Sequence, residues 1–120
     1  MRDFRKLIVW QRAHQLTLGV YKASNSFPAR EIYGLTAQLR KACLSIELNI
    51  AEGTGRGRPA QFFHFLEIAS GSASEVDCVL EVCRDLGLLA RGCHEAFARD
   101  VSEIRKMLWS LSQKVEGARP

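Results

Sequence analysis

Three turn-rich stretches, at residues 26–34, 53–60 and 87–92, interrupt an otherwise continuous helical pattern in this chain of 120 residues. They separate segments of about 20 to 28 residues, which are too long for ordinary strands and too polar to cross a membrane. The length is near that of a common single domain. The pattern therefore predicts an all-α fold, an antiparallel up-down four-helix bundle that forms one domain over residues 1–120.

Proline and glycine mark the expected helix ends. Pro59 fits the first turn of the third helix, where its missing N–H costs nothing. Gly87 fits the left-handed residue that closes that helix, and Gly53 is a candidate for the same role in the second helix.

The second helix is expected to be apolar on two opposite faces. Leu35, Leu39, Ala42, Ile46 and Ile50 form one stripe at helical spacing, and a second stripe lies almost diametrically opposite. A four-helix bundle covers one face of each helix, so the pattern predicts a homo-oligomer, unless distorted packing buries both stripes in one monomer. The sequence does not decide which stripe faces inward. The candidate interface residues are Ala37, Leu44, Leu48 and Ala51, together with Trp109, which lies far from the apolar stripe of the last helix.

The formal net charge of +4 is unevenly distributed. Residues 1–60 carry ten Arg and Lys against four Asp and Glu, whereas residues 61–120 carry seven against nine. A basic half is compatible with binding of RNA or DNA through phosphate contacts. The candidate nucleic-acid-binding residues are Arg2, Arg5, Lys6, Arg12, Arg40, Lys41, Arg56 and Arg58.

The Gly53-x-Gly55-x-Gly57 stretch lacks the Gly-Lys-Ser/Thr of a Walker A loop and the preceding strand of a dinucleotide-binding motif. It is interpreted as a flexible connector. Alternatively, its permissive backbone lets Arg56 and Arg58 turn toward a phosphate.

No catalytic, metal or cofactor site is expected. The four cysteines form no C-x-x-C pair, and no histidine has a partner at ligand spacing. All four cysteines are interpreted as reduced, small apolar residues. Gln38, Ser45, Asn49 and Glu52 form a polar line between the two apolar stripes, which favours a hydrogen-bonded seam between helices over a ligand site.

Four sequence blocks resemble a known family. They are Asp3-Phe-Arg-Lys-Leu-x-x-Trp10, Tyr33-Gly-Leu-Thr-x-Gln-Leu-Arg40, Ser45-Ile-x-x-Asn-Ile-Ala-Glu-Gly53 and Phe65-Leu-x-Ile-Ala-x-Gly-Ser72. In this order they resemble the 23S ribosomal RNA intervening-sequence proteins, from about residue 2 to Leu88. The chain departs from that pattern at Glu47, where proline is usual, and at Arg58-Pro59, where a serine cap is usual.

The resemblance implies a small antiparallel bundle that assembles as a homo-oligomer, typically a ring of five. A related branch, the accessory variability determinant of diversity-generating retroelements, is understood to bind nucleic acid and a reverse transcriptase. Two functions are therefore weighed: a non-enzymatic module that binds RNA or DNA without sequence preference, and a scaffold that docks a partner enzyme such as a reverse transcriptase without binding nucleic acid. No signal peptide or spanning segment is recognisable, so a cytoplasmic protein without a membrane partner is expected.

Overall fold

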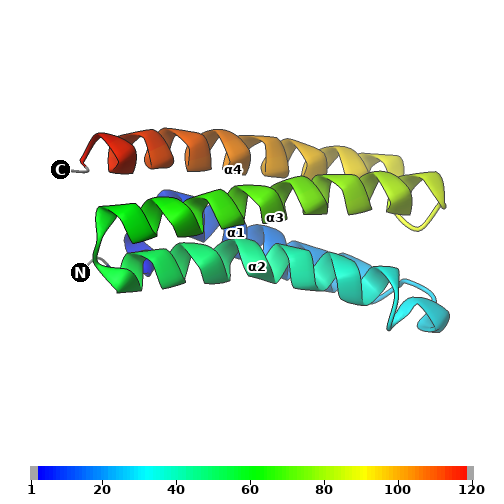
Figure 1. The fold of residues 1–120 in the computed structure, drawn as a ribbon. Coiled ribbons are helices and arrows are strands. Elements are labelled where there is room, and N and C mark those ends of the chain that lie inside the picture. The colour runs from blue at the N-terminus through cyan, green and yellow to red at the C-terminus, as the bar shows by residue number, and fades with distance from the viewer. Residues whose placement is uncertain (1–2, 119–120) are drawn as a thin grey trace.

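The computed structural model describes residues 3–118, and within them every regular element is helical. Four long helices, α1 (Ile8–Ser24), α2 (Leu35–Arg56), α3 (Pro59–Asp85) and α4 (Arg91–Gly117), are accompanied by the short 3-10 helices η1 (Phe4–Lys6) and η2 (Ala29–Glu31). Consecutive long helices run in opposite directions along a body of 49 × 22 × 20 Å (Figure 1). The predicted up-down four-helix bundle is confirmed.

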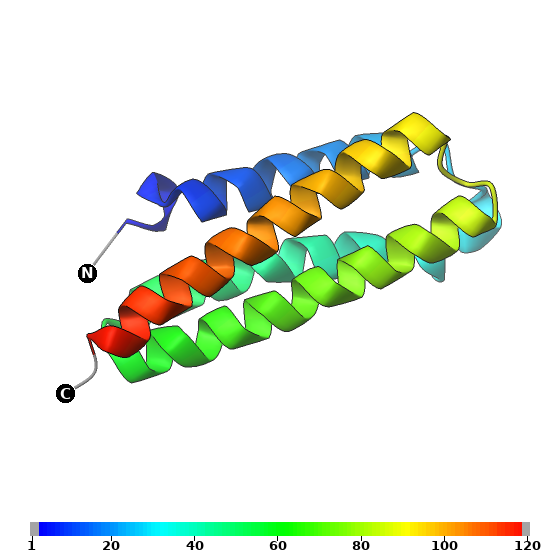
Figure 2. The same ribbon diagram turned by 90° about the horizontal axis from the view of Figure 1, so that it is seen from above.

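Each long helix packs against two others, with the most extensive contact between α2 and α3 and the least between α1 and α4. Seen from above, α1 and α4 diverge toward the end of the bundle where the chain begins and finishes (Figure 2). That end also holds the α2–α3 turn, and we call it the terminal end (Figure 1). The opposite end, which holds the α1–α2 and α3–α4 connections, is the far end.

The structure decides which stripe of α2 faces the core. Leu39, Ile46 and Ile50 are at most 1% exposed, whereas Leu44 and Leu48 on the opposite stripe are 36% and 57% exposed. Helix α2 therefore has both predicted apolar faces. Leu39, Ile46 and Ile50 lie on the inner face, and Leu44 and Leu48 lie on the outer face.

The prediction of a glycine-rich connector over residues 53–60 is wrong. Helix α2 continues through Gly53 and Gly55 to Arg56, and Gly57 closes it with a φ of +76°. Gly53 is needed for close packing instead: a Cβ at this position would lie 2.8 Å from Cδ1 of Phe62. Its glycine lets α3 approach α2 and does not break the helix.

The other two predicted boundaries are confirmed. Pro59 is the first residue of α3, and Arg58 before it provides no side-chain cap. Gly87 follows α3 with a φ of +74°. Its N–H donates to the carbonyl of Arg84 at 2.9 Å, and the N–H of Leu88 donates to that of Cys83 at 2.8 Å. This is the Schellman arrangement, which pairs the carbonyls left open at a helix end.

Candidate nucleic-acid interface

Four of the predicted phosphate-binding cations are held in contacts within the chain. The first, Arg5, lies 3.1 Å from a carboxylate oxygen of Asp3, and its guanidinium lies 4.5 Å from the centre of the Phe4 ring. These contacts fix the short η1 turn ahead of α1. Arg5 is therefore less available to bind a phosphate than an unpaired arginine is.

Arg12 joins α1 to α4. It pairs with Glu103 and lies 3.9 Å from Asp100. The hydrogen bond from Arg12 lowers the pKa of the Glu103 carboxyl, and the same bond raises the pKa of Arg12. Because two carboxylates surround Arg12, we assign it a structural role and no longer count it as a phosphate ligand.

Arg40 closes the end of α1. Its guanidinium donates to Oγ of Ser24 at 2.8 Å, to the carbonyl of Tyr21 at 3.2 Å and to Oδ1 of Asn25 at 3.1 Å. It also lies over the Tyr21 ring. An arginine that binds the last carbonyls of a helix compensates their partial negative charge, so this residue too is structural.

Arg56 is the last residue of α2 and not a loop residue, as the sequence had suggested. Its guanidinium lies 3.5 Å from a carboxylate oxygen of Glu52, one turn earlier, and 5.3 Å from the centre of the Phe65 ring on α3. The surface pair is exposed, so Arg56 keeps part of its capacity to bind an anion.

Lys6, Lys41 and Arg58 are the candidates that remain free. All three are exposed, and within residues 3–118 no hydrogen bond or ion pair engages their side chains. Lys6 and Arg58 belong to the terminal end, whereas Lys41 lies on the outer face of α2. The remaining candidate, Arg2, lies outside the described residues.

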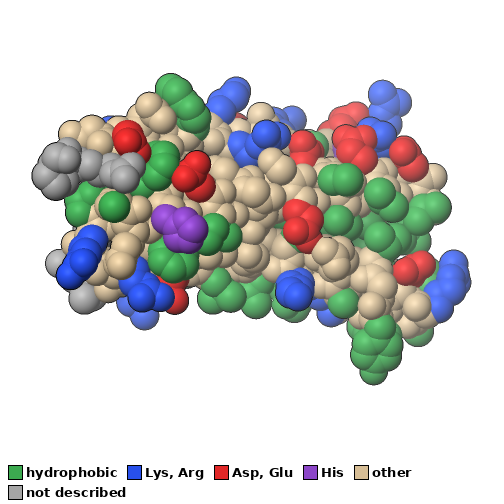
Figure 3. All heavy atoms as spheres, viewed as in Figure 1, with side chains coloured by type: hydrophobic (Ala, Val, Ile, Leu, Met, Phe, Trp, Pro, Cys, Tyr) green, Lys and Arg blue, Asp and Glu red, His purple; other side chains and the backbone are tan. Residues whose placement is uncertain are grey.

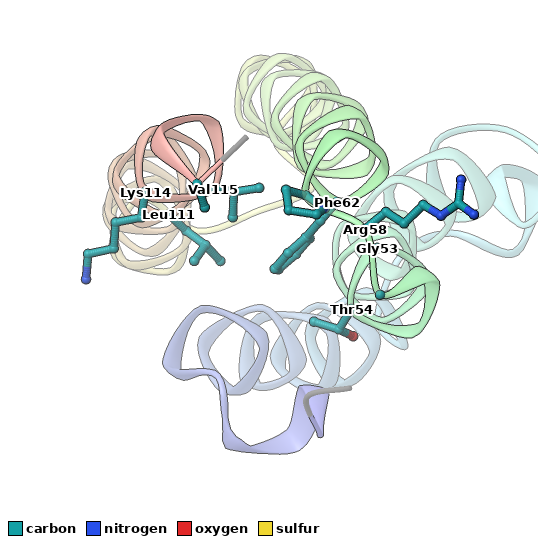
Figure 4. Close-up of a pocket in the computed structure, with 10 residues that line it drawn as sticks. Gly53, Thr54, Arg58, Phe62, Leu111, Lys114 and Val115 are labelled. Carbon is teal, nitrogen blue, oxygen red and sulfur yellow. The ribbon is translucent and has the colours of Figure 1, made fainter. Parts of the chain in front are cut away.

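A cavity of about 300 Å³ opens at the terminal end, between the last turn of α2, the first turn of α3 and the end of α4. Phe62, Leu111 and Val115 contribute its apolar surface. Figure 4 shows the side chains of Arg58 and Lys114 directed away from this cavity, on opposite sides of it. The two cations therefore flank an apolar hollow, and their charged groups are exposed to solvent.

A second hollow lies where α1 and α4 diverge. Leu7, Ile8 and Met107 contribute to its largely apolar surface, and three lysines line it: Lys6, Lys106 and Lys114. Lys114 lines both hollows, so one basic surface runs around the terminal end. We define the basic end as Lys6, Arg58, Lys106 and Lys114.

Sequence reasoning missed Lys106 and Lys114. Both lysines belong to the half of the chain with a net negative charge. Within that half, the segment between Glu103 and Glu116 has three basic residues and no acidic one, and the average over the half conceals this. On the face drawn in Figure 3, Lys and Arg side chains lie at both ends and between them, interspersed with Asp and Glu side chains. The net charge of a sequence half therefore does not describe the charge around any one residue on the surface.

The polar seam predicted along α2 is confirmed for Gln38, Ser45 and Asn49 but not for Glu52, which is exposed and pairs with Arg56 of the same helix. Ser45 and Ser72 hydroxyls lie 2.8 Å apart across the α2–α3 contact. The Asn49 amide donates back to the Ser45 carbonyl at 2.8 Å, and Gln38 donates to Glu75. These bonds satisfy the polar groups between two packed helices.

Glu47, at the position where proline is usual in the resembling family, is 7% exposed. Its carboxylate lies 3.0 Å from Nδ1 of His14 on α1, and the His14 ring stacks on Trp10 at 4.7 Å. A buried carboxylate requires such a partner. The pair is therefore part of the α1–α2 contact.

The predicted interface residues lie on the surface. Ala37 is exposed and Ala51 is half-buried on the outer face of α2, with Leu44 and Leu48 between them. Trp109, which is 65% exposed, lies apart from them on α4. The structure thus leaves an apolar outer face on α2 and a separate exposed aromatic residue.

All four cysteines are free. Burial, with a smaller contribution from Glu47, raises the pKa of Cys43 to about 12.

Among residues 3–118, no three His, Cys, Asp or Glu side chains are grouped so as to hold a metal ion. No helix in this described part is long and apolar enough to span a bilayer.

Comparison with known proteins agrees with the fold. Residues 5–110 match the family model described as 23S rRNA-intervening sequence protein. A crystal structure of a protein of unknown function, from the S23 ribosomal protein family of Bacteroides thetaiotaomicron, superposes with a TM-score of 0.81. It has 22% sequence identity, and the match covers 88% of this chain and 96% of that one. No curated protein gives a significant match.

Proposed function

Because the chain belongs to the 23S rRNA-intervening sequence protein family, and membership of this family does not define a biochemical activity, we propose a function from the charges and apolar faces on its surface. In this proposal it is a non-enzymatic, cytoplasmic module that assembles as a homo-oligomer and binds RNA or DNA without sequence preference. The supporting observation is the basic end. Its three lysines and one arginine are exposed, and their side chains form no ion pair or hydrogen bond with residues 3–118. Lys6 and Lys106 act only as nearby charges that lower the pKa of Asp3 and of Glu103.

The chemistry of the basic end suits phosphates. Lysine and arginine bind phosphate oxygens by charge, and the release of condensed counterions drives the association. The side chains of Arg58 and Lys114 are directed to solvent, so a phosphate backbone reaches them without entering a cleft. Such contacts position a nucleic acid and carry no sequence information.

Oligomerisation supplies the affinity that a few surface cations lack. The outer face of α2 exposes Leu44 and Leu48, and an apolar face of this kind is stabilised when a second copy covers it. Five subunits of formal charge +4 would carry a charge of about +20, and linked weak contacts gain by avidity. The ring of five follows from the family resemblance and is part of the proposal.

Fluorescence anisotropy tests the proposal with several unrelated oligonucleotides at low salt. We expect Lys6→Gln, Arg58→Gln and Lys114→Gln in one chain to weaken binding to every sequence by about tenfold or more. The matched control is Lys22→Gln, Arg30→Gln and Arg91→Gln, which removes the same charge at the far end. Equal losses in both variants would show that net charge matters and that the basic end does not.

A scaffold function is the second candidate. The hollow between α1 and α4 is largely apolar, and Ile8 beside it is 65% exposed. Such a surface suits a helix of a partner protein, such as a partner enzyme. If the intact oligomer binds no oligonucleotide at low salt, this function replaces the first.

A further inference from the structure

Trp109 differs from the other tryptophan of the chain. Trp10 stacks on His14 and lies 4.9 Å from the Phe4 ring centre, so its faces are used inside the molecule. Trp109 is 65% exposed on α4, and within residues 3–118 no ring or cation packs on its indole. Tryptophan is usually well buried, so a free indole face on the surface needs an explanation.

The indole borders a hollow of about 540 Å³ between α3 and α4. Three serines line it, Ser70, Ser74 and Ser102. Gly71 also lines it, and a Cβ added there would meet nothing within 4 Å, so the hollow is open in front of α3. The lining combines one large aromatic face with small hydrogen-bonding groups, and the volume is in the range of small-molecule sites, about 300–1,000 Å³.

Two cations share this hollow. Arg105 and Lys106 precede Trp109 by four and three residues, which places them on the same side of α4. Arg105 lies 3.7 Å from Asp77 on α3, so its charge is partly compensated. Lys106 is exposed and also lines the neighbouring hollow with Lys6 and Lys114. The Trp109 hollow is therefore continuous with the basic end.

From this arrangement we infer that the Trp109 hollow is a stacking site for an unpaired base, so that a single strand is bound more tightly than a duplex, which only the cations contact. The indole stacks on the base, the serine hydroxyls face its polar edge, and Lys106 with Arg105 holds the adjoining phosphates. A base within a duplex has both faces covered by its neighbours and is not available to the indole. Stacking tolerates any base, in keeping with binding that ignores sequence. This inference rests on the proposed function.

The experiment compares three ligands with the intact oligomer: a thymidine oligonucleotide, an abasic oligonucleotide with the same number of phosphates, and a duplex. We expect Trp109→Leu to weaken binding of the thymidine oligonucleotide about tenfold and to leave the abasic ligand and the duplex unaffected. The matched control is Tyr33→Leu, which removes another exposed aromatic residue, 95% exposed, at the far end. Circular dichroism and light scattering verify that both variants keep their fold and mass.

A second measurement uses the native indole. In a Trp10→Phe background the fluorescence of Trp109 reports alone, and the thymidine oligonucleotide is expected to quench it where the abasic one does not. The inference is overturned if Trp109→Leu binds all three ligands as the unmodified protein does. It is also overturned if this variant forms a smaller assembly, because Trp109 would then be a subunit contact. If the unmodified protein binds none of the three ligands, the proposed function fails as well.

Discussion

A Cβ on Gly53 would lie 2.8 Å from Cδ1 of Phe62 and 3.0 Å from Cβ of Phe65. The α2–α3 contact therefore depends on the missing side chain at this position. We expect Gly53→Ala to destabilise the bundle by about 1–3 kcal/mol, as other overpacked cores are. Thermal unfolding followed by circular dichroism measures the change.

The control for this prediction is two residues away. Gly55 is exposed in the same helix, and an added Cβ there meets nothing within 4 Å. Gly55→Ala is expected to stabilise the protein by roughly 0.5–1 kcal/mol, since glycine inside a helix is less favourable than alanine. Equal effects at the two positions would show that packing against Phe62 is unimportant.

His14 is expected to compensate the buried charge of Glu47. His14→Ala leaves that carboxylate without its partner, at an expected cost of about 1–3 kcal/mol. Adding Glu47→Leu removes the charge itself, so the double variant should be more stable than His14→Ala alone. Urea unfolding of four proteins, the unmodified chain, His14→Ala, Glu47→Leu and the double variant, checks this order. Costs that simply add would contradict the assigned pairing.

The Arg12–Glu103 pair predicts a pH dependence. Because the pKa of Glu103 is lowered in the folded state, the pair stabilises the protein above the usual carboxyl pKa of 4.5, and this stability is lost as the pH falls through the lowered value. Glu103→Gln should lower the melting temperature slightly at pH 7 and not at all in strong acid. A difference that stays constant across that range would contradict the pairing.

The outer face of α2 is expected to hold subunits together. Since Leu44 and Leu48 are exposed in the protomer, Leu44→Glu with Leu48→Glu should leave the helices folded and reduce the mass measured by light scattering. Leu86→Glu, at an exposed leucine at the end of α3, is the control and should keep the mass. An unchanged mass in the double variant would remove this face from the assembly.

Local patterns predicted the architecture well. The apolar stripes repeat every three to four residues, and Pro59 and Gly87 act through their own backbones, so these features are readable without the fold. Gly53 could not be interpreted in this way. Its role depends on Phe62 of the next helix, a neighbour that only the packed structure brings close.

The candidate site was predicted less well for a related reason. Whether an arginine is free depends on tertiary partners, and the carboxylate that binds Arg12 is 91 residues away in the chain. Lys106 and Lys114 were missed because charge was averaged over half of the sequence. A window of one or two helical turns would have found them between Glu103 and Glu116.

The salt dependence of binding tests the central claim most directly. Anisotropy with the unmodified protein and several unrelated oligonucleotides, at three salt concentrations, gives the slope of log affinity against log salt. We predict the same steep slope for every sequence, with about 0.9 per phosphate neutralised on duplex DNA and about 0.7 on single strands. No binding at low salt, or an affinity that does not change with salt, would contradict a nucleic-acid-binding function.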